Sequence, residues 1–299
     1  MDRDTFIIPV YCLGVEHDRA YAALYPLRHG GFAPELSDAA VLPMESCGEY
    51  LTQHTDQDLF DYFHAHDRHF FPALTDRTVC IRQAANLWQV TAAIQQRLVR
   101  LSGHAADPVQ AIDTLPVPVC TYTRGGQRDR CLPCEAAYGD CAAKQLPDDG
   151  FKLGLRITRC GMLTHSPWLP ARPHALPHLE AWVEGFSGLV PADTGCIDAV
   201  RHALWQTRHH IIILTPPRTR MAPSPYSRAL RKASARWRKR IETVGAQLTE
   251  RCAMAHMRVR DLWHFHHRVS RKVLAHTVCV LLNLQLGRSP MDLDGLVCD

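Results

Sequence analysis

Between residues 109 and 214, short apolar runs alternate with helical stretches and turn signals, and this alternation limits the fold more than any other feature of the chain. Short apolar runs bounded by turn residues predict strands. We expect strands at 109–123, 150–158, 161–167, 188–192 and 211–214, with helices at 177–184 and 197–207. Alternating elements of this kind are typical of the α/β class. The sequence therefore predicts a mixed α/β core.

The segments on either side of this core have a helical texture. Helices are expected at 39–51, 78–101, 227–250 and 259–286. The stretch 102–108 holds Ser, Gly, Asp and Pro, and it marks the change from helices to strands. We therefore divide the chain into an N-terminal helical domain (1–105), an α/β domain (106–250) and a C-terminal helical extension (251–299).

Positive charge is concentrated in the last third of the chain. The whole chain has a formal net charge of +4, whereas residues 216–299 carry 16 Lys/Arg against 6 Asp/Glu. The part from 216 to 240 has no acid at all, which suits a phosphate backbone. The alternative is a solvated helix face, although basic residues on such faces are usually interleaved with acids. The basic residues of this run are Arg218, Arg220, Arg228, Arg231, Lys232, Arg236, Arg238, Lys239 and Arg240.

The 12 cysteines are scattered through the chain, and no signal peptide precedes them. A chain of 299 residues needs no disulfide scaffold, so we expect a reducing, cytoplasmic location. Cys131 and Cys134 could suggest zinc, but no second pair follows at a zinc-ribbon spacing. The apolar stretches 6–15 and 273–286 are shorter than the ~20 residues of a membrane span, so no membrane segment is expected.

Three acids stand where a carboxylate could carry chemistry. Asp113 interrupts an apolar strand, where a buried carboxylate is costly unless it is paired or binds a metal. Asp193 ends a short strand, at the edge where α/β sheets commonly place ligands, and Glu242 is the first acid after the basic run. Three oxygen ligands from separate elements suit Mg²⁺. From the residues alone, a turn or cap role for Asp193 and a helix salt bridge for Glu242 remain open.

A family resemblance runs through most of the chain. The runs 113–120 (DTLPVPVC), 135–139 (EAAYG), 141–144 (CAAK) and 150–152 (GFK) resemble the first-aspartate region of bacterial DDE insertion-sequence transposases, in the branch numbered nine-eighty-two. The runs 241–244 (IETV) and 247–251 (QLTER) are similar to the glutamate motif of that branch. Further similar runs are 36–38 (LSD), 48–51 (GEYL), 82–88 (RQAANLW), 258–263 (RVRDLW), 274–277 (LAHT), 286–288 (LGR) and 294–297 (DGLV).

The resemblance implies an RNase H-like catalytic core at 106–250, with Asp113, Asp193 and Glu242 as catalytic residues that hold two Mg²⁺ ions, for which Mn²⁺ can substitute. The activity would be cleavage and strand transfer at insertion-sequence ends. The implied partners are the inverted-repeat ends, the target DNA and further copies of the chain, in a dimer or higher oligomer, at the nucleoid. The N-terminal helices would bind or assemble on DNA. The expected DNA-contacting residues are Lys152, Arg218, Arg220, Arg231, Lys232, Arg236, Arg238, Lys239 and Arg240.

The chain departs from the family pattern at three positions and in one short segment, where Pro147, Asp148 and Asp149 replace an aromatic-rich strand start. The family usually has Asp-Lys-Gly-Tyr around its second aspartate, whereas this chain has Thr194 and Cys196 after Asp193, and it has Gly154 where the family tends to have a histidine. Asp198 is a fallback for the second ligand. Three alternatives therefore stay open: a decayed transposase copy that still binds DNA, an RNase H-like nuclease that cuts without joining, and a non-enzymatic DNA-binding protein.

Overall fold

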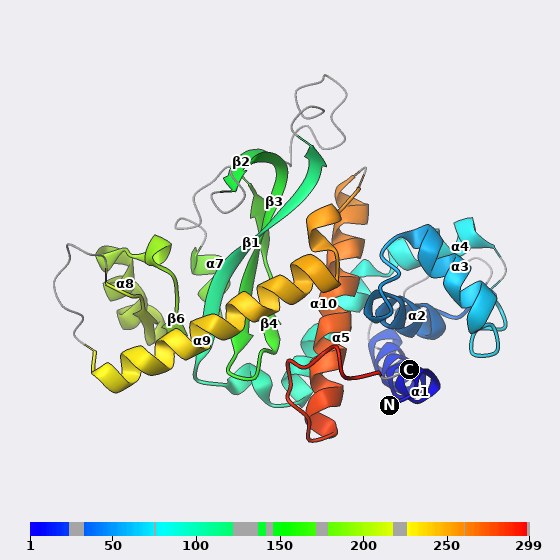
Figure 1. The fold of residues 1–299 in the computed structure, drawn as a ribbon, viewed down its shortest axis with the longest axis horizontal. Coiled ribbons are helices and arrows are strands. Elements are labelled where there is room, and N and C mark those ends of the chain that lie inside the picture. Colours follow the sequence, from blue (N-terminus) through cyan, green and yellow to red (C-terminus); the bar gives the residue numbers. More distant parts are fainter. Residues whose placement is uncertain are drawn as a thin grey trace. The chain divides into compact units, whose positions relative to one another are not determined.

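The computed structural model describes residues 1–23, 33–74, 76–121, 137–141, 146–171, 179–217, 226–259 and 261–297 (Figure 1). The chain forms two compact units. The helical unit comprises Met1–Ser102, Glu250–Met254 and Val259–Asp299, and the mixed unit comprises Gly103–Thr249 and Ala255–Arg258. The predicted mixed α/β fold with helices at both ends of the chain is confirmed.

The helical unit contains α1 (Arg3–Ala22), α2 (Asp38–Tyr50), α3 (Asp56–His66), α4 (Arg77–Asn86), α5 (Trp88–Leu101) and α10 (Leu262–Gln285). Helix α10 packs against α2, α4 and α5, so the C-terminal segment belongs to the same unit as the N-terminal helices. Every residue of this helix from Val273 to Asn283 is buried, including the polar His276, Thr277 and Asn283. The single helix expected at 78–101 is two helices that meet at Leu87. None of the helices in the described ranges is both long and apolar enough to span a membrane.

A buried ionic network joins α2 to α10 inside the helical unit. Arg271 Nε donates to Glu49 Oε1 at 2.6 Å, and Lys272 Nζ donates to Glu49 Oε2 at 2.8 Å. Burial alone would raise the pKa of Glu49, but the two adjacent cations outweigh it and lower this pKa to about 2. Asp56 also pairs with Arg271, at 2.8 Å. The charges therefore sit in a buried site only because they neutralise one another.

The mixed unit contains a sheet built around β3. Its strands are β1 (Gln110–Thr121), β2 (Ala137–Cys141), β3 (Leu146–Thr158), β4 (Leu163–His165) and β5 (Trp168–Pro170), and β3 is antiparallel to each of the other four. Of the strand expected at 161–167, only the part that forms β4 is a strand, and β5 begins just after these bounds. β3 begins four residues before the expected 150, and β2 was not expected.

Two further strands extend the arrangement beyond β1. β6 (Gly188–Pro191) and β7 (Ile211–Leu214) are parallel to each other. A parallel bridge pairs Val109 with Leu189, whose N–H donates to the Pro108 carbonyl at 2.8 Å, so β6 lies beside the start of β1. Across the mixed unit, β1 thus has the antiparallel β3 on one side and the parallel β6 and β7 on the other.

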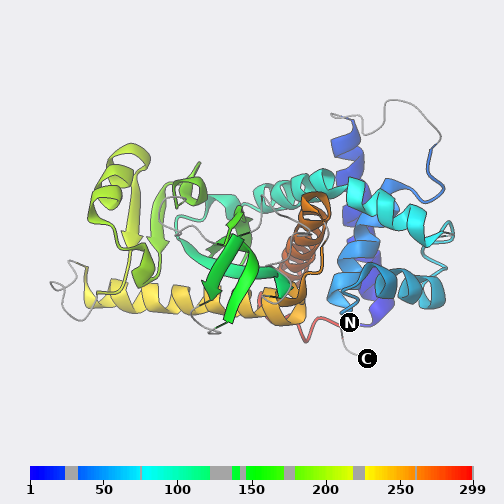
Figure 2. The same ribbon diagram turned by 90° about the horizontal axis from the view of Figure 1, so that it is seen from above.

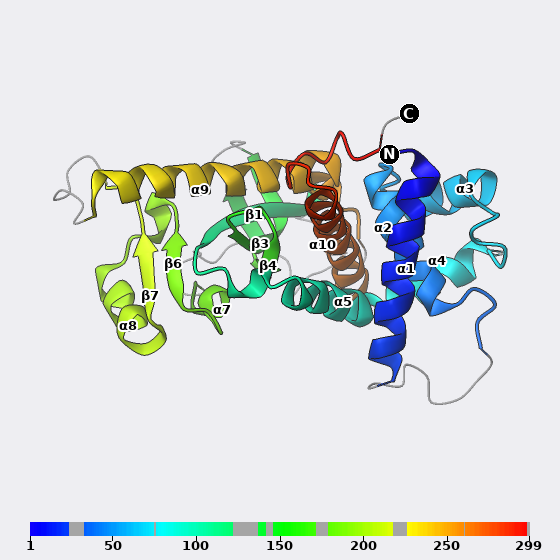
Figure 3. The same ribbon diagram turned by 90° about the horizontal axis from the view of Figure 1, so that it is seen from below.

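Helices cover both faces of these strands. Trp182 of α7 (Leu179–Val183) and Trp205 of α8 (Ala199–His209) are buried in a core cluster with Ile112 and Val190. Helix α9 (Arg228–Ala246), which continues into a π-helical turn at Gln247–Arg251, packs against β1, β3 and β6. In Figures 2 and 3, α9 crosses one end of β6 and β7, and α8 lies near the other end of these strands.

Candidate active site

Asp113 is the fourth residue of β1 and lies on the face that α9 covers. Side chains alternate along a strand, so Asp113 shares a face with Leu115. A Cβ on Gly245 of α9 would lie 3.8 Å from Leu115 Cδ1, which identifies this face as the one beneath α9. The Asp113 carboxylate is half-buried and accepts a hydrogen bond of 2.7 Å from the Thr114 N–H. The strand thus holds this carboxylate in a fixed direction.

Asp193 comes two residues after β6 and is level with Asp113. The bridge between Val109 and Leu189 is parallel. Asp113 comes four residues after Val109, and Asp193 comes four residues after Leu189. The Ala192 N–H donates to the Leu214 carbonyl at 3.0 Å, which extends the β6–β7 pairing to the residue before Asp193. The Asp193 side chain is 54% exposed, so a ligand can reach it from solvent.

Glu242 faces Asp193 across Arg238, which precedes it by one turn of α9. Arg238 Nη2 donates to Asp193 Oδ1 at 3.1 Å and lies 3.7 Å from Glu242 Oε1. The Glu242 side chain is 60% exposed, and that of Arg238 is 27% exposed. One guanidinium therefore holds together two of the acids singled out in the sequence.

The pKa of Asp113 shows that all three acids share one electrostatic environment. Burial raises this pKa first, the Thr114 N–H lowers it, and the negative charges of Asp193 and Glu242 raise it while Arg238 lowers it. Burial also raises the pKa of the Cys196 thiol to about 11, and Asp113 and Asp193 add to that rise. The sequence thus identified three carboxylates that the fold brings within electrostatic reach of one another.

The spacing of these carboxylates is wider than that of a closed ligand set. Among the described residues, the group of His, Cys, Asp and Glu whose ligand atoms all lie within 4.8 Å of one another is Asp4, Asp67 and His69, in the helical unit. In that group, Asp67 forms an ion pair of 3.3 Å with Arg3. In the mixed unit, the Arg238 guanidinium occupies the place where a cation between Asp193 and Glu242 would lie.

Asp198, the alternative candidate for the second metal ligand, instead caps helix α8. It is the N-cap of α8, where its Oδ1 accepts from the Arg201 N–H at 3.1 Å. Its second oxygen lies 3.4 Å from Arg201 Nε. The Asp198 carboxylate is thus engaged with its own helix, whereas Asp193 is the acid that shares Arg238 with Glu242.

The departures from the family pattern are accommodated by local packing. A Cβ on Gly154 would lie 2.6 Å from Trp182 Nε1, so the absence of a side chain at 154 is what lets the Trp182 ring pack there. Cys196 is buried in the core cluster with Trp182. The contact between Gly154 and Trp182 could not be predicted from local sequence patterns, because the two residues are far apart along the chain.

The expected DNA-contacting residues differ in position. Lys152 is three residues from Leu155, the partner of Asp113 in β3, so its side chain lies on the opposite face of the sheet from Asp113. Arg240 donates to the Arg159 carbonyl. Arg231, Lys232, Arg236 and Lys239 are exposed on α9. Arg218, Arg220, Cys131 and Cys134 lie outside the described residues.

The resemblance to insertion-sequence transposases rests on the sequence motifs alone. No family model, no curated protein and no solved structure matches the chain.

Proposed function

We propose that the chain is a DNA transposase of the DDE type, which cleaves and joins DNA at the ends of an insertion sequence. One observation carries the proposal: Asp113 and Asp193 stand level on two neighbouring parallel chain segments, and Arg238 joins Asp193 to Glu242. Three carboxylates from a strand, a strand end and a helix thus converge beside a helix rich in Arg and Lys.

The arrangement of the mixed unit supports an RNase H-like core. The strand that bears Asp113 has an antiparallel neighbour on one side and two parallel strands on the other, and helices pack on both faces. Asp193 follows the first of the parallel strands, and Glu242 lies on the helix that covers Asp113. This is the order in which an RNase H-like DDE enzyme presents its three acids.

The donor set has the chemistry that Mg²⁺ requires. Asp113, Asp193 and Glu242 offer hard carboxylate oxygens and would hold two Mg²⁺ or Mn²⁺ ions completed by waters and DNA phosphates. Bound ions activate the attacking oxygen and stabilise the leaving oxygen of an in-line displacement. Burial raises the pKa of Asp113 first, and repulsion from Asp193 and Glu242 raises it further, whereas the positive charge of Arg238 lowers it. Added cations would therefore favour the ionised carboxylate.

The basic flank of α9 supplies a surface for the DNA backbone. Lys232, Arg236 and Lys239 are exposed on the part of the helix that turns away from the strands. Such residues bind phosphates without reading sequence, so they would position the strand while the acids act on one phosphate. We extend this proposal to Lys152, Arg218, Arg220 and Arg240 as further backbone contacts, to the helical unit as a second DNA-binding and assembly part, and to a dimer or higher oligomer as the DNA-bound state.

The test is Mg²⁺-dependent cleavage and joining of duplexes that carry the DNA flanking the coding region. We expect Asp113→Asn, Asp193→Asn and Glu242→Gln each to reduce both reactions by a factor on the order of 10²–10³, while Asp198→Asn leaves the reactions largely intact. Cleavage without joining would instead identify a nuclease. Binding without any cleavage in Mg²⁺ or Mn²⁺ would identify a decayed copy or a non-enzymatic DNA-binding protein.

The decayed copy is the second candidate because of two observations. Gly154 and Cys196 are integrated into the packing around Trp182, so the side chains that the family has at these positions are replaced here by core contacts. Such a chain would keep the basic surface of α9 and its affinity for DNA.

A further inference from the structure

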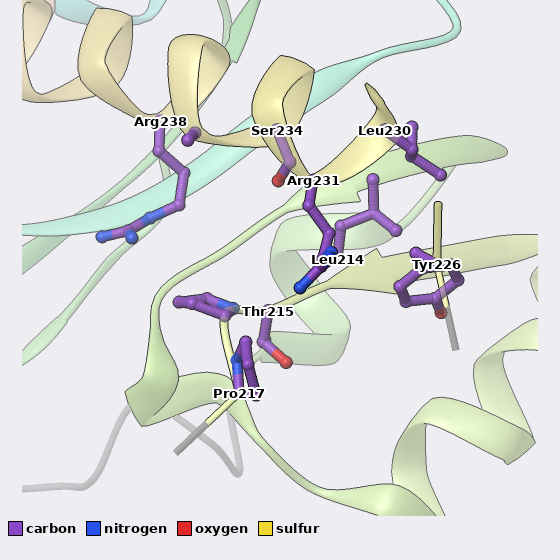
Figure 4. A pocket seen from close by; sticks show the side chains of 10 residues that line it. Leu214, Thr215, Pro217, Tyr226, Leu230, Arg231, Ser234 and Arg238 are labelled. Carbon is purple, nitrogen blue, oxygen red and sulfur yellow. The ribbon is translucent and has the colours of Figure 1, made fainter. Parts of the chain in front are cut away.

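A pocket of about 220 Å³ opens between the end of β7 and the first half of α9, and Figure 4 shows it from close by. Thr215, Pro216 and Pro217, which follow β7, form one wall, and successive turns of α9 form the other. Arg238, which bridges two of the acids, also lines this pocket. The pocket and the candidate active site therefore share Arg238. Its lining is Leu214, Thr215, Pro216, Pro217, Tyr226, Leu230, Arg231, Ser234, Ala235 and Arg238.

The lining combines an apolar body with positive charge. Leu214, Pro216, Pro217 and Leu230 give apolar walls, and the Tyr226 ring adds an aromatic surface. In Figure 4, Arg231 extends from α9 toward Thr215. A ligand that fits must have an apolar, preferably flat body and a negative charge close to it.

Arg231 and Arg238 project from the same side of α9. They are seven residues apart, which is about two helical turns. Arg238 is engaged with Asp193 and Glu242, whereas no carboxylate in the described part of the chain pairs with Arg231. A guanidinium without an acidic partner at the edge of an apolar pocket is suited to bind a phosphate.

Size narrows the class of ligand. Pockets for drug-sized molecules measure roughly 300–1,000 Å³, so this pocket suits a smaller body, such as one nucleobase. Nucleobases stack on aromatic and apolar side chains, and enzymes that act on DNA draw single nucleotides out of the base stack.

We infer that this pocket receives one unstacked nucleobase of the DNA strand, from a nucleotide close to the phosphate at the Asp113–Asp193–Glu242 site, and that Arg231 binds the phosphate of that nucleotide. The inference rests on the proposed function. It adds a subsite that fixes which phosphate reaches the acids, because a seated base sets the register of the strand.

The experiment uses the full chain and duplexes with the DNA that flanks the coding region, in which 2-aminopurine replaces one base at a time. Binding is measured in Ca²⁺, and 2-aminopurine fluorescence rises when the base leaves the stack. We expect a several-fold rise at one position near the cleaved phosphate. Ala235→Leu, which fills the pocket, and Arg231→Ala should remove more than half of that rise.

Two matched controls lie outside the pocket. Ala229→Leu on α9 and Arg208→Ala on α8 change exposed residues that do not line the pocket, and they should leave the rise unchanged. The inference is overturned if 2-aminopurine fluorescence rises at no position, or if Ala235→Leu does not alter the rise. Cleavage by a chain that shows no rise leaves the proposed function standing without the subsite, whereas a rise without cleavage keeps the subsite and overturns the proposed function.

Discussion

Arg238 donates a 3.1 Å hydrogen bond to Asp193 while its guanidinium lies 3.7 Å from Glu242. A cation that binds these acids must therefore displace the guanidinium. Because the Arg238 side chain is only 27% exposed, its displacement would move a mostly buried side chain. The arrangement makes Arg238 a competitor of metal ions and, once it is displaced, a free cation beside the DNA.

Replacement of Arg238 should therefore strengthen metal binding. In Arg238→Gln we expect the dissociation constant for Mn²⁺ to fall about fivefold, the factor that corresponds to ~1 kcal/mol for a partly exposed ion pair. Isothermal titration without DNA measures it. Arg236→Gln changes an exposed residue of the same helix and should have no such effect. Unchanged or weaker binding in Arg238→Gln would contradict the competition.

Asp113 should lower the stability of the fold at neutral pH. A carboxyl whose pKa is raised in the folded state binds its proton more tightly there, so stability is lost as pH rises through the ordinary pKa toward the raised one. Asp113→Asn removes this loss and should raise the melting temperature at pH 7 by about 2–4 °C. The difference should vanish below pH ~3.8, where both states of the wild type are protonated. A lower melting temperature for the variant at pH 7 would refute this.

Glu49 should have the opposite pH dependence. Its pKa is lowered to about 2 in the folded state, so its stabilising effect is complete above the ordinary value of 4.5 and is lost as pH falls from 4.5 through 2. Glu49→Gln leaves Arg271 and Lys272 buried without this carboxylate and should cost about 3–5 kcal/mol of unfolding free energy. Urea denaturation at pH 7 measures it.

The control for Glu49 is Asp61→Asn, which changes an exposed acid of α3 and should cost less than ~0.5 kcal/mol. The double variant Glu49→Gln/Lys272→Met should recover part of the loss, because one unpaired cation is removed with its partner. Equal effects of Glu49→Gln and Asp61→Asn would show that the buried network is not stabilising.

Gly154 should tolerate no side chain. A Cβ there would lie 2.6 Å from Trp182 Nε1 and 3.1 Å from Pro167 Cγ, so the buried ring must shift. We expect Gly154→Ala to cost about 1–3 kcal/mol, the usual cost of overpacking. Gly195 is the matched control, because a Cβ there meets nothing within 4 Å. If both variants unfold at the same urea concentration, the packing of Trp182 over Gly154 is wrong.

Local patterns predicted much of the fold, and long-range pairing supplied the rest. The apolar runs around Asp113 and before Asp193 each predicted a strand, one containing Asp113 and the other ending near Asp193. The observed strands β1, β6 and β7 lie close to their expected bounds. The sequence could not show that Val109 pairs with Leu189, because that bridge joins residues 80 positions apart. The sequence also could not show that Arg238 lies between Asp193 and Glu242. A run of basic residues has the same sequence pattern whether its side chains face solvent or carboxylates.

The central claim is that Asp113, Asp193 and Glu242 act as one cation site. Isothermal titration calorimetry, with Mn²⁺ added to the full chain, tests this claim without requiring catalysis. We predict that Asp113→Asn, Asp193→Asn and Glu242→Gln each weaken binding at least about tenfold, the factor for ~1.4 kcal/mol, and that Asp198→Asn binds as the wild type does. Binding that is unchanged in all three variants would contradict the account.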